Sequence, residues 1–363
     1  MVFDWAESID LGDLSEEEKE KLRTDHNYKR TINDLMREGR AAAKGTSCIY
    51  CGKDTSSFCN SHSIPAFCLR NVATKGQVIT PNAMIDFPLL ETEKGVNKAG
   101  TFQIICRECD SRIFSDYENP ENYYTSPTPR MIAQIALKNS LRAISKRRFE
   151  TGFFNAGYAK FGRGKDIVDL KNQVNDLDLA EYTADFNRAK KAIEKNRTSD
   201  YYLCFFENLN YVVPIAFQCE IALVFDFEGN IINNVYNPAP EYKVKSIHLC
   251  VFPLENHTSI FMFVDSENKR YRKFMKQFNR LSLEDKLAAL TFIMFAYSED
   301  VFFAKSIQEI VATDTALCSA SRSSQEVLSS CLGVDPYEVI RENFDLGKRR
   351  DIPNLLSEKY KLR

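Results

Sequence analysis

Three observations in the sequence predict an α+β protein. The stretch from Cys48 to Glu118 holds two Cys-x-x-Cys pairs, which is the ligand spacing of a zinc-bound unit. Charged segments with helical periodicity lie on both sides of that stretch. After residue 199, aromatic and β-branched runs alternate with turn residues, which favours an antiparallel sheet, and further helical periods follow. We therefore expect a zinc unit with helical flanks and a C-terminal domain of antiparallel sheet and helix.

Composition narrows the class of protein. The chain has 363 residues, 44% of them apolar, and a formal net charge of -2, so it has material for two or more packed cores and any nucleic-acid surface must be local. It shows neither a membrane-length apolar run nor a basic-then-apolar start, so we expect a cytoplasmic protein with no membrane partner. Eleven cysteines, an odd number, favour reduced thiols and a bound metal over a disulfide framework.

Changes in composition along the chain suggest four parts. They are an N-terminal helical arm (1–46), the zinc-bound unit (47–125), basic and bridging helices (126–198) and an α+β recognition or assembly domain (199–363). The arm reads as two helices. Ser15, with Glu18 three residues later, has the spacing of a capping box for the first, and Ile32 and Leu35 give the second a packing face.

The predicted zinc-bound unit is built around two Cys-x-x-Cys turns. Two residues between paired cysteines allow both sulfurs of a tight turn to face one ion, so Cys48, Cys51, Cys106 and Cys109 can close a tetrahedral Zn²⁺ site. A strand is expected over 102–105. A helix should follow from about Cys109 to Pro120, with Asp110 in its first turn and Glu118 two turns further on.

The order of these features resembles the zinc-stapled branch of the HNH, or ββα-metal, endonucleases, which are relatives of treble-clef zinc proteins. The shared pattern is a first Cys pair, a His followed by x-Ile-Pro, a strand, a second Cys pair and a short helix, and it covers roughly a fifth of the chain. The resemblance implies that His62 is the general base for hydrolysis of a DNA phosphodiester and that the four cysteines hold structural zinc. It further implies that Asp110, with Glu118 as a substitute ligand, holds a catalytic Mg²⁺ or Mn²⁺.

Three positions depart from the family pattern. Ser61 precedes His62 where the family has Asp or His, Thr101 stands near an expected Asn, and Phe114 replaces a helical metal ligand. These departures favour an alternative, a catalytically inactive treble-clef zinc module that binds nucleic acid or a protein partner. If the protein is a nuclease, the family association suggests the effector of a bacterial anti-phage defence system, with a second copy or another defence protein as partner.

A basic helix is expected after the zinc unit. Lys138, Arg142 and Lys146 recur every four residues without an acid before Glu150, so they form one stripe that is suited to phosphate contacts; a solvated face of an amphipathic helix is the alternative. The glycine-containing stretch 152–166 lacks the Lys-Ser/Thr of a phosphate-binding loop and reads as a flexible connector.

The C-terminal domain carries no recognisable motif. Its segments 201–236 and 246–265 read as antiparallel hairpins, and helices are expected over most of the remainder. His248 and His257 lie outside any cluster of metal-ligating residues, so we expect structural roles for both. The basic and aromatic run from Lys269 to Arg280 could bind nucleic acid, but its aromatic residues have helical spacing, which favours packing in the core.

Overall fold

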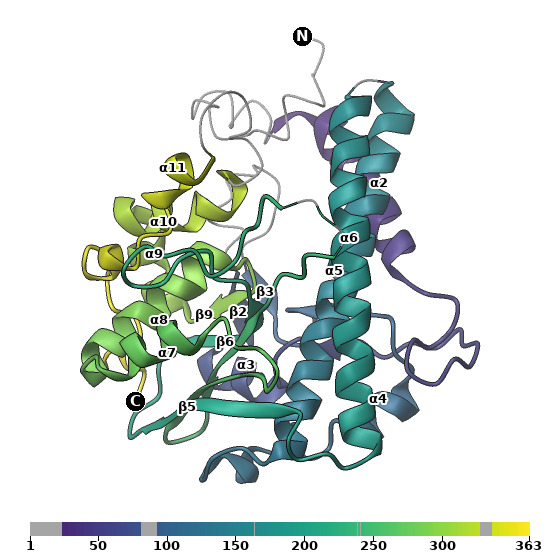
Figure 1. The fold of residues 1–363 in the computed structure, drawn as a ribbon. Helices are drawn as coiled ribbons and strands as arrows, with labels where there is room; N and C mark the ends of the chain where they lie inside the picture. The colour runs from purple at the N-terminus through teal and green to yellow at the C-terminus, as the bar shows by residue number, and fades with distance from the viewer. Residues whose placement is uncertain (1–23, 81–92, 163, 238, 240, 327–335) are drawn as a thin grey trace.

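The computed structural model describes residues 24–80, 93–162, 164–237, 239, 241–326 and 336–363. A seven-stranded antiparallel sheet lies between two helical layers (Figure 1). Its strand order is β3-β2-β9-β6-β7-β8-β5. The strands are β2 (Gln77–Ile79), β3 (Glu93–Gly95), β5 (Tyr201–Leu209), β6 (Ile215–Ile221), β7 (Ile247–Pro253), β8 (Thr258–Asp265) and β9 (Val301–Phe303).

Alternating side chains of the sheet fill two separate cores. Ile215, Phe217 and Leu249 belong to one core, on the face covered by the C-terminal helices. Their neighbours Ala216 and Cys250 belong to the other, shared with the zinc unit and the long helices. The C-terminal layer consists of α7 (Arg272–Asn279), α8 (Leu283–Tyr297), α9 (Gln308–Thr313), α10 (Thr315–Glu326) and α11 (Pro336–Arg341).

The opposite layer is dominated by three helices, α2 (His26–Ala43), α5 (Pro129–Phe161) and α6 (Lys165–Glu194). Thr128 caps α5 by accepting a hydrogen bond from the Met131 amide, and Gly162 ends the helix in the left-handed conformation. The helix thus runs through most of the predicted connector 152–166. Its extra turns pack on α2, where Gly152 lies so close to Ala42 that a side chain at Gly152 would clash.

Segment 47–125, predicted to be the zinc-bound unit, contains short elements only. A two-stranded sheet pairs β1 (Ser61–His62) with β4 (Thr101–Phe102). The segment also contains α3 (Ala66–Val72), α4 (Arg107–Ile113), a 3-10 helix (Pro120–Tyr123) and the strands β2 and β3 of the large sheet. The strand expected over 102–105 is therefore shorter, and the helix expected to reach Pro120 ends at Ile113. Glu118 consequently follows α4, rather than lying two turns along it from Asp110.

Strand pairing differs from the sequence prediction at two places. The hairpin β7–β8 forms as expected, but β5 pairs with β8 and β6 pairs with β7 and β9, so β5 and β6 are not a hairpin. Residues 301–303, predicted as helix, form strand β9, which pairs with both β6 and β2. Local periodicity does not identify β9, because its two partners lie far away in the sequence.

One sheet also joins segments that the sequence divides into separate parts. Strands β2 and β3 come from 47–125, and β9 bridges them to the strands of 199–363. The helix predicted to begin at Ser15 lies outside the described residues. None of the described helices is both long and apolar enough to span a membrane.

Candidate metal centre

Four cysteine sulfurs from two distant turns lie together at the edge of the protein. The sulfur atoms of Cys48, Cys51, Cys106 and Cys109 are all within 4.8 Å of one another. Zn–S bonds of about 2.3 Å would place the sulfurs of a tetrahedral site roughly 3.8 Å apart, so this spacing fits one metal ion such as zinc. The thiolate donors suit Zn²⁺ and are a poor choice for Mg²⁺ or Ca²⁺.

The backbone positions each pair of sulfurs. Gly52 adopts a positive φ of 73° and its amide donates to the Cys48 carbonyl, which closes the first turn. Cys106 is the residue before α4, so Cys109 comes in the first turn of that helix. The two turns are joined by the Cys106 amide, which lies 3.3 Å from the Cys48 sulfur.

The electrostatics of this cluster differ from thiol to thiol. Burial raises the pKa of Cys48, but backbone amides of Cys106, Cys51 and Tyr50 more than offset it and lower that pKa to about 7. Burial and neighbouring thiols raise the pKa of Cys109 well above its ordinary value. A bound cation would favour the thiolate form of all four residues, because it compensates the charges that otherwise repel.

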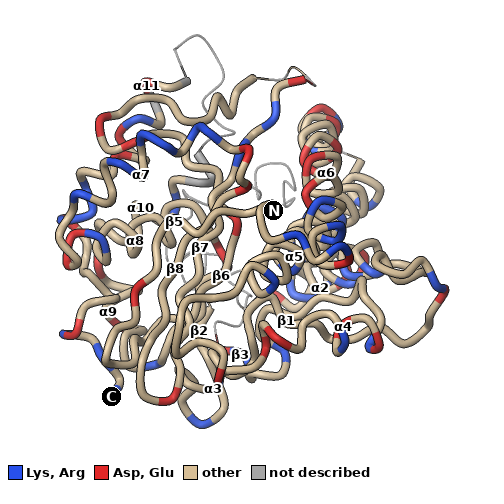
Figure 2. The backbone as a smooth tube through the Cα atoms, turned by 60° about the horizontal axis from the view of Figure 1, so that its bottom comes forward, with Lys and Arg blue, Asp and Glu red and all other residues tan. Residues whose placement is uncertain are grey.

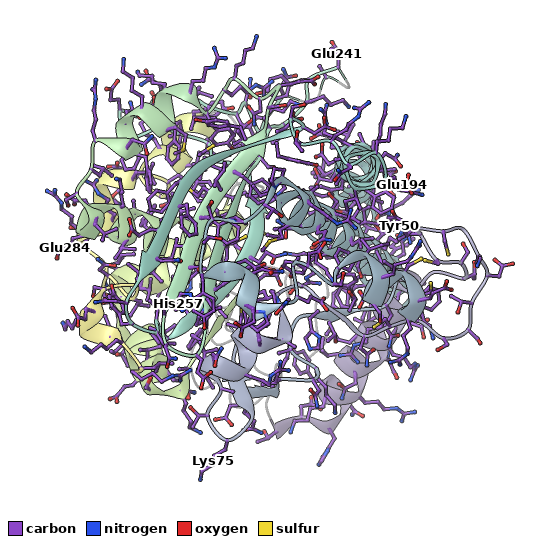
Figure 3. All side chains as sticks on the ribbon, turned by 90° about the horizontal axis from the view of Figure 1, so that it is seen from below. Tyr50, Lys75, Glu194, Glu241, His257 and Glu284 are labelled. Carbon is purple, nitrogen blue, oxygen red and sulfur yellow. The ribbon has the colours of Figure 1, made fainter. Side chains whose placement is uncertain are left out.

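The cysteine cluster is attached to α6 through Tyr50. Lys190 Nζ donates to the Tyr50 carbonyl at 2.6 Å, and the Tyr50 ring meets Phe186 edge-on with centroids 6.4 Å apart. Figure 3 shows sulfur atoms gathered near Tyr50 at the rim of the molecule. The cysteine cluster is thus formed by the two Cys turns, and the first of these turns is attached to α6.

A second polar cluster surrounds Lys138, whose side chain is completely buried. The Lys138 ammonium lies 2.9 Å from Ser61 Oγ, 3.1 Å from Asp110 Oδ1 and 3.2 Å from Glu118 Oε1. It also lies 3.6 Å from the centre of the Phe114 ring. Ser61 donates a hydrogen bond to Asp110. We call Ser61, Asp110, Glu118 and Lys138 the lysine cluster.

The lysine cluster determines the charge state of Asp110. Burial alone would raise the pKa of this carboxyl group, but the Lys138 ammonium and the Ser61 hydroxyl lower it below its ordinary value. Asp110 is therefore an ionised carboxylate that is already neutralised by a protein cation. The two carboxylates predicted to hold Mg²⁺ or Mn²⁺ do come together, but around Lys138.

His62 does not join these carboxylates. It follows Ser61 in β1, and successive side chains of a strand point to opposite faces. Ser61 faces Asp110, whereas His62 Nε2 lies 3.0 Å from the carbonyl oxygen of Val96. The expected assembly of His62, Asp110 and Glu118 around one scissile phosphate is therefore not present in this arrangement.

Each of the three cations in the predicted phosphate-binding stripe contacts an acidic residue of the protein itself. Lys138 is buried in the lysine cluster, and Arg142 binds Asp300 through two hydrogen bonds of 2.7 and 3.2 Å. Lys146 Nζ lies 2.8 Å from Glu299 Oε2. The acids come from the loop before β9, so the sequence around α5 gave no sign of them. These pairs argue against the predicted phosphate contacts.

A different set of cations comes from the segments that lead into the two Cys turns and from α5, which contacts the chain just before the first turn. These residues come from the end of α2, the chain on either side of the first Cys turn (the first knuckle), the start of α4 and the middle of α5. None of them has a carboxylate partner among the described residues. They are Arg40, Lys44, Lys53, Arg107 and Arg148. Lys44 lies over the ring of Phe58, which pairs with Cys106, and the Arg148 guanidinium lies beside Gly45. Figure 2 shows Lys and Arg on α2, α4 and α5, across the sheet from α7. We call this set the knuckle cations.

The buried role of Lys138 differs from the predicted phosphate contact, although the sequence contains one signal for it. Lys138 lies three residues from both Ile135 and Leu141, which are buried on α5, so it falls on the apolar face of its own helix. A charged residue in that position needs a buried partner.

The two histidines predicted to have structural roles do make such contacts. His248 stacks on Phe263, and His257 contacts the Tyr123 carbonyl.

The fold and the cysteine cluster define a mixed α and β protein with a candidate zinc centre. Comparison of the chain with protein-family models, curated proteins and solved structures finds no match. The function must therefore be argued from the geometry of the site.

Proposed function

We propose that the protein is a non-catalytic, zinc-stapled module that binds nucleic acid through the knuckle cations. The observation that carries this proposal is that five cations on α2, α4, α5 and the chain beside the first Cys turn have no carboxylate partner among the described residues. Unpaired Lys and Arg side chains on one surface are the usual electrostatic footprint of a phosphate-binding protein. The first Cys turn, the antiparallel pairing of β1 with β4 and the start of α4 at the second Cys pair support a treble-clef arrangement.

The lysine cluster supports the non-catalytic part of the proposal. A divalent ion between Asp110 and Glu118 would have to displace the Lys138 ammonium or lie beside it, where like charges repel. His62 would also have to turn to the other face of β1. The metal-dependent endonuclease expected from the resemblance thus requires a rearrangement of two elements, and the binding module requires none.

Salt-dependent binding to DNA tests the proposed surface. We expect Lys53→Ala/Arg107→Ala to weaken binding of duplex DNA similarly for unrelated sequences and to reduce the slope of log K against log salt by about 2. The matched control is Arg142→Ala/Lys146→Ala, which removes two cations that are already paired with Asp300 and Glu299. This control should leave DNA binding nearly unchanged.

The opposite pattern would overturn the assignment of the surface. If only Arg142→Ala/Lys146→Ala weakens binding, the phosphate contacts lie on α5, as the sequence stripe predicted. Cleavage assays with Mg²⁺ and Mn²⁺ on duplex and single-stranded DNA test the catalytic part. Divalent-dependent cutting that is lost in His62→Ala would establish an endonuclease and end the non-catalytic reading.

A further inference from the structure

A small polar cavity lies between the sheet and the two long helices α5 and α6. It has a free volume of about 20 Å³, which is room for one or two water-sized groups. Ala136 and Ser140 of α5 and His248 of β7 line the cavity and are buried. Residues 244–246 also line it but are partly exposed, so the cavity can be reached from the solvent.

Two carboxylates that line this cavity have no hydrogen-bond donor from the protein. The Oε1 atom of Glu220, at the end of β6, is completely buried and accepts no hydrogen bond from any described residue. Asp185 of α6 is half-buried and makes no hydrogen bond or ion pair within the described ranges. Because buried polar atoms of native proteins nearly always have a partner, the unpaired Glu220 oxygen indicates a bound group at this point.

The cations that line the cavity are directed to other carboxylates. Arg188 Nε lies 3.1 Å from Asp265 Oδ2, and its Nη2 lies 3.0 Å from Glu267 Oε2. Burial raises the pKa of Asp185, and the charge of Lys245 opposes that shift. The cavity is thus lined by three carboxylates and two cations, so it has one negative charge that the lining does not compensate.

Glu220 is the carboxylate with the least compensation. Burial and the charges of Asp185 and Asp178 raise the pKa of Glu220 well above its ordinary value. His248 lies directly opposite Glu220 in the β6–β7 pair, but burial lowers the pKa of His248 to about 3, so its imidazole is neutral. Lys138 supplies the missing charge in the lysine cluster, whereas no described residue supplies it for Glu220.

We propose that this cavity binds a primary ammonium group, either the ammonium ion or the end of a small organic amine, with Glu220 and Asp185 as acceptors. Such a group brings one positive charge and N–H donors, which form strong hydrogen bonds with carboxylates. A chelated divalent ion fits less well. Among the described residues, the cysteine cluster is the only group of three or more metal-ligating side chains within reach of one ion.

Saturation-transfer difference NMR of the full chain with zinc bound measures this binding, with methylammonium as the probe. We expect saturable binding with a dissociation constant on the order of 1 to 10 mM. Ammonium chloride should displace the probe, whereas potassium chloride and tetramethylammonium chloride, which have no N–H donor, should not at equal ionic strength. Tighter binding of propylammonium than of ammonium would assign an organic amine, and the reverse order would assign the ammonium ion.

Two isosteric variants locate the site. Glu220→Gln should raise the dissociation constant at least about 10-fold, because it removes a charged acceptor. The matched control is Glu207→Gln, which changes a half-buried glutamate of β5 outside the cavity and should leave the constant unchanged. Because Glu220 has no donor from the described residues, Glu220→Gln without amine should unfold at a temperature no lower than the parent.

Several results would overturn the proposal. They are the absence of saturable binding up to about 100 mM methylammonium, displacement by potassium chloride as effective as by ammonium chloride, and equal weakening by both variants. A Glu220→Gln variant that unfolds well below the parent would also contradict it, because Glu220 would then hold a contact within the protein.

Discussion

The cysteine cluster and the lysine cluster are neighbouring polar sites that differ in how the repulsion between their like charges is compensated. Four sulfurs lie around one point, and among the described residues the only cation in contact with them is Arg112, 4.0 Å from the Cys109 sulfur, whereas two carboxylates and a hydroxyl surround the Lys138 ammonium. Both contain groups that repel when ionised. The cysteine cluster needs a bound metal ion to compensate its thiolates, whereas the lysine cluster contains the Lys138 ammonium. This difference is why we expect a metal ion in the cysteine cluster and none in the lysine cluster.

Replacement of one cysteine should have the largest effect. Cys106→Ser removes a ligand that joins the first Cys turn to α4, and structural zinc can contribute on the order of 10 kcal/mol to folding. We expect the parent to hold one zinc per chain by elemental analysis and the variant to lose the metal and much of its stability. A variant that melts like the parent, with or without zinc, would mean that the cysteine cluster has no structural role.

Replacement of Lys138 should have the next largest effect, and it tests the other side of the comparison. Lys138→Met keeps the length of the side chain but leaves Asp110 without its buried partner, which typically costs about 3–5 kcal/mol of unfolding free energy. The control is Lys146→Met, which loses an exposed pair with Glu299 and should cost no more than about 1 kcal/mol. Equal losses in denaturant unfolding would show that burial of Lys138 is irrelevant.

His248 is, like Lys138, a basic side chain that is buried in the protein. Burial lowers the pKa of His248 to about 3, so it is neutral in the folded protein, where its Nδ1 lies 3.0 Å from the Asn139 side-chain amide. The unfolded chain takes up this proton near pH 6.5, so stability should fall as the pH drops below that value, by up to about 1.4 kcal/mol per pH unit. His248→Gln should remove this part of the slope between about pH 6.5 and 5.5, with zinc held constant.

The comparison also explains which features the sequence could predict. The four cysteines form two pairs, each with two residues between its members. The sequence therefore specifies how the two sulfurs of each pair lie, and only the approach of the two turns had to be inferred. Asp110 and Lys138 are 28 residues apart on different helices. No local pattern specifies that contact, and the apolar surroundings of Lys138 were the one available signal.

The same reasoning applies to the sheet. The β7–β8 hairpin was predicted because its two strands follow each other in the chain, whereas the pairing of β2 with β9 joins residues that are more than 200 positions apart. The stripe of Lys138, Arg142 and Lys146 was correctly seen as helical in spacing. Its acidic partners Asp300 and Glu299 come from a segment predicted as helix, so their approach could not be anticipated.

The most direct test of the central claim is a Mn²⁺ titration followed by electron paramagnetic resonance, with the cysteine cluster already filled with zinc. Because the Lys138 ammonium contacts both Asp110 and Glu118, we expect the wild-type protein to bind no Mn²⁺ stoichiometrically in the micromolar range, and Lys138→Ala to gain affinity for it. A stoichiometric micromolar Mn²⁺ site in the wild type that is lost in Asp110→Asn would contradict the account, because it would show that the carboxylates hold a divalent ion despite Lys138.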